Sequence, residues 1–179
     1  MTPGRAEPAA DRDQRTLRRA FGEFATGVTV MTVGEPRPHG MTANSFTSVS
    51  MDPPLALVCV GHEAVMYRRL AAGCFGVSVL AAAQEPVARH FADLSRPLGI
   101  AQFEHIDCEP GPTTGVPLIR GALARFELRV CGVHDGGDHA IFVGRVLWSE
   151  RSAPCPDGAL VFHRGSFHRL GARHSEVTA

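Results

Sequence analysis

Residues 42–50 read TANSFTSVS and hold one amide and five hydroxyls in nine positions, close to Gly40. These side chains and the neighbouring backbone N–H groups are neutral donors, which suit the carbonyls, ring nitrogens and phosphate of a bound organic molecule. The segment is therefore the first candidate binding site. The alternative is a Ser/Thr-rich edge strand whose hydroxyls contact only water.

Residues 80–91 read LAAAQEPVARHF, the pattern of a strand that leads into a helix. The first N–H groups of this helix are predicted to point outward without partners, where they attract a phosphate or a carbonyl oxygen. Arg89 and His90 add charge one turn later. The alternative is an ordinary strand-to-helix junction with Arg89 in solvent.

Residues 137–144 read GDHAIFVG, an apolar strand with a polar start. Strand periodicity puts His139 on one face with Ile141 and Val143, and Asp138 on the other face. The glycines just before Asp138 permit a tight turn. A histidine at such a rim can donate a hydrogen bond or stack on a planar ring. The alternative is a structural histidine with satisfied hydrogen bonds.

Several classes of chemistry lack their residues. All 18 basic residues are arginine, so neither a Schiff-base lysine nor a phosphate-loop lysine is present. No G-x-S-x-G, H-E-x-x-H or strand-linked G-x-G-x-x-G occurs, and His163 and His168 have no third ligand near them in the sequence. We therefore expect no metal, and any dinucleotide must bind outside a Rossmann unit.

Composition limits the partners and the compartment. The 18 basic and 18 acidic residues cancel, so nucleic acid and anionic membranes are not expected partners. No apolar run approaches the roughly 20 residues that span a bilayer. The five cysteines contain no C-x-x-C pair, which fits a reducing cytoplasm better than a disulfide framework. We expect a cytoplasmic protein.

The elements that must position these residues are mainly strands. We expect a tail at 1–12, one domain at 13–171 and a second tail at 172–179. A helix from Gln14 to Gly27 is predicted to carry Leu17, Phe21 and Phe24 on one face. Further helices are predicted at 63–72 and 84–92, and 93–117 is left as a loop. Strands are predicted at 28–33, 40–50, 55–60, 75–80, 123–133 and 139–148, with a closing hairpin at 159–170. The apolar strand 55–60 is predicted to be covered on both faces, and so many strands with few helices imply a closed barrel.

Read in order, several blocks resemble the short-chain flavin reductases, the reductase components of two-component flavin-dependent monooxygenases. The blocks are FATGVTVMTV, HGMTANSFTSVSMDPPLALVCV, FGVSVLAAAQEPVARHFA, PLIRGALARFEL and GDHAIFVGRV. The resemblance runs from Leu17 to Leu170 with the family's order and spacing. The segments AVMYRRL, ARHFADLSRP and GGDHAIFVG are most similar to actinobacterial reductases of antibiotic biosynthesis.

This resemblance implies an FMN-binding split barrel, usually a homodimer, that passes hydride from NADH or NADPH to exchangeable FMN or FAD. NADH is the favoured donor. The reduced flavin is expected to diffuse to a partner monooxygenase, in natural-product biosynthesis. Two alternatives stay open. One is a split-barrel flavoprotein with tightly held FMN that acts on an organic substrate, and the other is a flavin-binding module without catalysis.

The resemblance also implies the site. His139 is the nicotinamide contact, and the family often has tyrosines where this chain has Phe162 and Phe167, so no hydroxyl contact is expected there. The implied flavin contacts are Thr42, Ala43, Asn44, Ser45, Ser48, Ser50, Cys59, Val60, Gly61, Leu80, Ala81, Gln84, Arg89, His90 and Phe91.

Overall fold

A computed structural model of the chain describes residues 14–70, 73–152 and 158–170. The two tails expected at 1–12 and 172–179 lie outside these residues. The helices are α1 (Gln14–Gly22), α2 (Val65–Leu70), α3 (Glu85–Ala92) and the short 3-10 turns η1 (Ala82–Gln84) and η2 (Gly99–Phe103). The strands are β1 (Thr26–Gly27), β2 (Thr29–Val33), β3 (His39–Ala43), β4 (Thr47–Met51), β5 (Pro54–Gly61), β6 (Cys74–Val79), β7 (Cys108–Pro110), β8 (Pro117–Ile119), β9 (Ala124–Gly136), β10 (His139–Arg151), β11 (Leu160–His163) and β12 (Ser166–Arg169).

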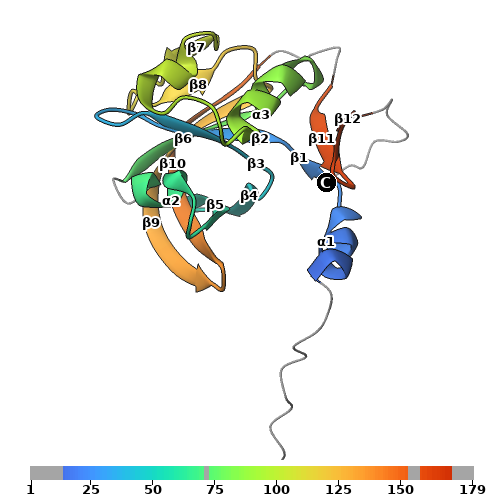
Figure 1. Cartoon of the computed structure of the whole chain (residues 1–179). Helices are drawn as coiled ribbons and strands as arrows, with labels where there is room; N and C mark the ends of the chain where they lie inside the picture. Colours follow the sequence, from blue (N-terminus) through green and yellow to red (C-terminus); the bar gives the residue numbers. More distant parts are fainter. Residues whose placement is uncertain (1–13, 71–72, 153–157, 171–179) are drawn as a thin grey trace, which may run out of the picture.

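Seven strands form one curled sheet in the order β3-β2-β6-β9-β10-β5-β4 (Figure 1). The end strands β3 and β4 are joined through residues 44–46, and no backbone pairing links them among the residues described. Hydrogen bonds therefore do not close the barrel, which corrects the closed barrel expected from the strand count. Helix α2 contacts both β3 and β5 and buries Met66 and Leu70. The fold is mainly β with few helices and has the split form that the resemblance implies.

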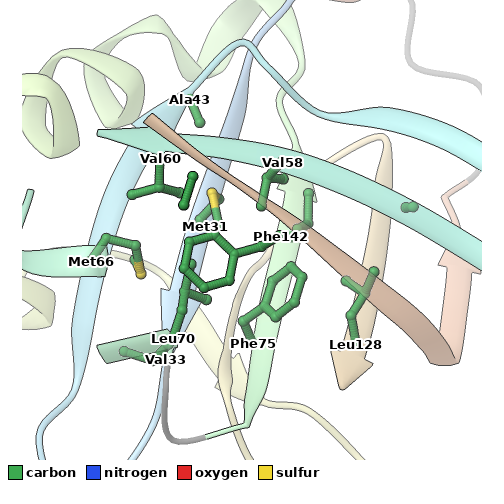
Figure 2. Close-up of a cluster of buried hydrophobic side chains, with 13 residues drawn as sticks. Met31, Val33, Ala43, Val58, Val60, Met66, Leu70, Phe75, Leu128 and Phe142 are labelled. Atoms are coloured by element: carbon green, nitrogen blue, oxygen red, sulfur yellow. The ribbon is translucent and has the colours of Figure 1, made fainter. Parts of the chain in front are cut away.

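The sheet wraps around one apolar core, which Figure 2 shows. Met31 of β2, Val58 of β5, Phe75 of β6, Leu128 of β9 and Phe142 of β10 meet there, all at most 2% exposed. Each lies on the inner face of its strand because successive side chains alternate between the two faces. This packing fixes which side chains of β5 and β10 face outward.

Strand β2 is buried on both faces, because a second apolar cluster lies between it and α3. Val30 and Phe91 belong to this cluster, together with Leu80 and Leu160. The sequence predicted such two-sided cover for residues 55–60. That prediction is wrong, since burial along β5 alternates and its outer face is only half covered.

The strands β9 and β10 form a long hairpin that projects beyond the rest of the sheet (Figure 1). Gly136 pairs with His139, so the turn is only Gly137 and Asp138 rather than the five residues HDGGD. Gly137 has φ 85°, which a glycine at the first turn position adopts without strain. His139 is thereby the first residue of β10.

Two further predictions need adjustment. The segment 93–117 contains η2, β7 and β8 rather than only loop. Helix α1 ends at Gly22 instead of Gly27, so Phe24 lies beyond it. No residue of α1 is buried by its own chain, and Phe21 and Phe24 are 71% and 77% exposed. The small sheet β1-β11-β12 lies beside α1 (Figure 1), and the backbone of Leu160 in β11 bonds to Val28 and Leu80 next to the barrel.

Candidate functional site

The polar segment 42–45 leaves the end of β3, and its side chains hold neighbouring backbone. The Thr42 hydroxyl donates to the Ala88 carbonyl of α3 at 2.6 Å. The Asn44 amide donates to the Thr26 hydroxyl at 3.1 Å. Both residues remain partly or fully exposed, so their remaining acceptor atoms are open to a ligand.

Ser45 joins the end of β3 to β5. Its hydroxyl donates to the Cys59 carbonyl at 2.9 Å and accepts from the Cys59 N–H at 3.0 Å. Two residues further along β5, Gly61 pairs with His139. At about 3.3 Å per strand residue, this pair lies roughly 7 Å along the strand from Cys59. Ser45, Cys59, Gly61 and His139 are therefore brought together, with the buried Val60 turned inward.

The face of His139 is the one that strand periodicity predicted. Ala140 and Phe142 point into the core, whereas Ile141 is only half buried on the outer face. The His139 side chain is 48% exposed, and its Nδ1 lies 2.7 Å from the Asp138 carboxylate. Asp138 belongs to the turn and contacts His139, so its predicted place on the opposite strand face is wrong.

Residues around this rim were missed by the sequence reasoning. The ring of His62 contacts Tyr67 edge-on at 5.0 Å, and Tyr67 packs against Phe142 at 5.8 Å. The His62 Nε2 lies 4.0 Å from the Asp135 carboxylate. His62 follows β5 directly. Its position next to the predicted contacts at 59–61 was the signal in the sequence that could have identified it as a site residue.

Ser48 and Ser50 lie on β4, an end strand of the sheet that is largely exposed. The Ser50 hydroxyl donates to the Asp52 carbonyl at 3.0 Å. The register with β5 shifts between Ser48 and Ser50, as at a β-bulge. Their role as flavin contacts stays a prediction.

The start of the helical segment differs from expectation. The Ala81 N–H donates to the Gln84 side chain at 3.0 Å, and the Ala82 N–H donates to the Gly158 carbonyl at 2.9 Å. The Gln84 amide in turn donates to the Arg120 carbonyl. The backbone N–H of Gln84 donates to the Ala81 carbonyl at 2.9 Å, so the predicted row of unpaired N–H groups is wrong for Ala81, Ala82 and Gln84. Leu80 and Ala81 are buried.

Helix α3 places its three predicted residues in different surroundings. Arg89 forms an ion pair with Glu85 at 2.6 Å and lies over the Phe167 ring at 5.1 Å. His90 Nε2 is 2.8 Å from the Gln102 carbonyl. Phe91 is 1% exposed, so its side chain packs in the core and is closed to a ligand. Of the three, Arg89 alone lies on an exposed face.

A small cleft lies where β3, α3 and the β11–β12 hairpin meet. Its volume is about 160 Å³. Two polar side chains, Thr42 and Asn44, stand in an otherwise apolar lining, the composition typical of sites for small organic ligands. Sequence reasoning placed Phe162 and Phe167 near the site but not among its contacts. The lining residues are Val28, Thr42, Ala43, Asn44, Ala92, Phe162 and Phe167.

Two larger hollows of about 490 and 600 Å³ are lined by none of the predicted site residues. Both are rich in arginine and open to solvent. Their size alone does not make them the site, because the polar residues that the sequence predicted as ligand contacts lie in other parts of the structure.

Within residues 14–70, 73–152 and 158–170, no helix is long and apolar enough to cross a membrane. The same residues contain no group of three or more His, Cys, Asp or Glu side chains arranged to hold a metal ion.

Comparison with known proteins identifies relatives. Residues 21–171 match the flavin reductase like domain. An NADH-dependent FAD reductase of Streptomyces globisporus is 53% identical, with all of both chains covered. An NADH-dependent flavin reductase of Rhodococcus sp. is 43% identical over 86% of this chain and 85% of its own.

Two solved structures are also similar. BorF, the flavin reductase component of a bacterial two-component tryptophan halogenase, is 54% identical with TM-score 0.85, covering 90% of this chain and all of its own. The Streptomyces globisporus NADH:FAD oxidoreductase SgcE6, in complex with NAD and FAD fragments, is 48% identical with TM-score 0.84. That alignment covers 95% of this chain and all of the other.

Proposed function

Since the chain belongs to the flavin reductase-like family, we infer that it is an NADH-dependent flavin reductase that transfers hydride to FAD or FMN. The observation that carries this function is the full-length similarity to an NADH-dependent FAD reductase, joined to a cleft that suits a planar ring. The flavin supplies the ring system that accepts the hydride and a proton. Steady-state oxidation of NADH in the presence of added FAD, FMN or riboflavin tests this function.

The cleft between β3, α3 and the β11–β12 hairpin is proposed to take part of the flavin. Thr42 and Asn44 supply polar contacts, and Phe162 and Phe167 supply apolar walls. Hydride transfer requires the two rings to be held together and needs no general acid or base at that moment. The residues of the site therefore act mainly by positioning.

His139 is proposed to contact the nicotinamide, because its half-exposed ring lies at the rim formed by β5 and β10. Replacement by alanine is expected to raise the KM for NADH far more than the KM for flavin. His134, an exposed histidine of the same hairpin, gives the matched control when changed to alanine. Equal losses for both substrates in His139→Ala would contradict this role.

The flavin is proposed to exchange as a substrate. Neutral hydroxyl and amide groups hold a phosphate more weakly than a lysine-arginine cluster does, and Arg89 is already paired with Glu85. NADH oxidation should therefore scale with added free flavin, and the protein should lose its yellow colour on gel filtration. A protein that keeps its flavin during turnover would instead support the tightly held FMN alternative. Absence of NADH and NADPH oxidation would support the non-catalytic module.

We propose a homodimer in which a second copy covers the exposed apolar face of α1. Leu17 and Phe21 of α1, together with Phe24 just beyond its end, form this face, and the described residues of their own chain leave it uncovered. The cleft of about 160 Å³ is also smaller than the roughly 300 Å³ or more of a typical ligand pocket, so a partner surface would complete it. Phe21→Glu should lower the mass measured by light scattering. Leu94→Glu, which changes an exposed leucine outside this face, is the control.

The reduced flavin is proposed to diffuse to a separate flavin-dependent monooxygenase or halogenase, in natural-product biosynthesis. The similarity to the reductase component of a tryptophan halogenase supports this. The similarity to FAD reductases supports FAD as the preferred flavin. The four cysteines that the structure describes are free thiols, as in proteins of the reducing cytoplasm, where we place the reaction.

A further inference from the structure

The Asp138 carboxylate determines which nitrogen of His139 carries a proton. Its oxygen lies 2.7 Å from Nδ1. The hydrogen bond from His139 holds the pKa of Asp138 below its ordinary value. An ionised carboxylate can only accept hydrogen bonds, so Nδ1 must be the donor. In the neutral ring, Nε2 is then an acceptor.

The turn holds Asp138 in place beside the ring. Gly137 adopts φ 85°, and its N–H donates to the Asp135 side chain at 3.3 Å. The Asp138 carbonyl accepts from the His62 N–H at 3.1 Å, which ties the turn to the end of β5. The Asp138 side chain itself is 93% exposed. Removing an exposed partner costs little folding stability, so its contribution can be tested in a folded protein.

Gly61 keeps the other side of the imidazole open. A Cβ at Gly61 would lie 3.6 Å from His139 Nε2, the nearest atom it would meet. At that distance a side chain on residue 61 would pack against the imidazole, so glycine leaves this side of the ring less covered. The two neighbours of the ring act on different nitrogens. The Asp138 carboxylate accepts the hydrogen bond from Nδ1, whereas Gly61 places no side chain against Nε2.

We propose that Asp138 is a positioning residue that presents His139 Nε2 as an acceptor for the carboxamide N–H of NADH. The inference rests on the proposed contact between His139 and the nicotinamide. Of the groups on that ring, the carboxamide is the one that offers N–H donors. With Nε2 held as an acceptor, His139 favours this amide over analogues that lack the N–H donor.

Kinetics of Asp138→Ala test the first part. One hydrogen bond of ordinary strength is worth about 0.5–1.5 kcal/mol, so the KM for NADH should rise about two- to thirteenfold. Because this bond forms equally before and during hydride transfer, kcat should change little. The KM for flavin should also stay the same. Asp138→Asn, whose amide oxygen can still accept from Nδ1, should restore part of the affinity.

A second substrate tests the acceptor role directly. In the reduced 3-acetylpyridine analogue of NAD, a methyl ketone replaces the amide and removes its N–H donors. We expect the ratio of kcat/KM for NADH to kcat/KM for this analogue to fall in Asp138→Ala to the value found in His139→Ala. The His139→Ala ratio reports the intrinsic difference in reactivity between the two reductants.

The outcomes separate the two proposals. If His139→Ala leaves the KM for NADH unchanged, the nicotinamide role of His139 fails. If His139→Ala raises it while Asp138→Ala keeps the wild-type KM and ratio, the role of Asp138 fails alone. Glu63→Ala removes the same charge at an exposed position just beyond β5, outside the turn, and it should leave both values unchanged. An equal effect of Glu63→Ala would mean that charge, not positioning, explains the result.

Discussion

Replacement of His39 by leucine should make the protein less sensitive to mild acid. His39 starts β3 and is only 4% exposed, and its Nδ1 has no hydrogen-bond partner. Burial lowers the pKa of His39 from 6.5 to about 4, helped by the charges of Arg96 and Arg69. The folded protein therefore keeps this ring neutral at pH values where the unfolded chain protonates it.

The sign follows from proton linkage. Below pH 6.5 the unfolded state binds a proton that the folded state refuses, so stability falls as the pH falls until the folded pKa of about 4 is reached. At pH 5 this one group lowers the free energy of unfolding by about 2 kcal/mol relative to pH 7.5. The full loss, reached near pH 4, is about 3 kcal/mol.

Urea unfolding at fixed protein concentration, at pH 7.5 and pH 5.0, measures the effect. The difference in unfolding free energy between the two pH values should be about 2 kcal/mol smaller in His39→Leu than in the wild type. This comparison is insensitive to any packing change that acts equally at both pH values. His105→Leu, at an exposed position, is the control and should keep the wild-type difference. An unchanged difference in His39→Leu would refute the reasoning.

Two further substitutions test the packing and the buried hydrogen bonds of the fold. Gly40→Ala would place a Cβ 2.3 Å from the Phe91 ring, so it should cost about 1–3 kcal/mol of stability and raise the KM for flavin, whereas Gly27→Ala meets no atom within 4 Å. Thermal unfolding and flavin titration measure both effects. A Gly40→Ala variant with wild-type stability and flavin KM would contradict this prediction. The buried carboxylate of Glu127 accepts hydrogen bonds from backbone N–H groups, and Glu127→Gln replaces one of its oxygens by an NH2 group that cannot accept them. This substitution should lower the free energy of unfolding in urea by about 2–3 kcal/mol. Glu150 forms an exposed ion pair with Arg125, and Glu150→Gln should cost less than about 1 kcal/mol. Equal losses of stability in Glu127→Gln and Glu150→Gln would contradict the prediction.

Much of the fold follows from periodicity in the sequence. A continuous apolar run identified β5, and alternation along β10 gave the face of His139. Sheet closure did not follow, because strand count carries no information about which edges pair. The split between β3 and β4 depends on how residues 44–46 leave the sheet.

The candidate site was less predictable, because many of its polar groups already have hydrogen-bond partners within the fold. The hydroxyl of Thr42 is bound by α3, and the N–H of Ala81 is bound by Gln84. A sequence shows that such groups are polar and does not show whether the fold already uses them. The contact between Asp138 and His139 was missed for another reason: a two-residue turn removes Asp138 from the strand, where alternation no longer applies.

The two halves of the proposed site stand on different parts of the fold. Thr42 and Asn44 belong to the cleft at the end of β3, whereas His139 belongs to the projecting β9–β10 hairpin. Ser45 connects them, because its hydroxyl both donates to and accepts from the backbone of Cys59 on β5. The relative position of the two halves is therefore set by strand pairing and by one serine. A rigid spacing of this kind suits a reaction that depends on position, and the few neutral contacts within each half allow both substrates to leave after each transfer.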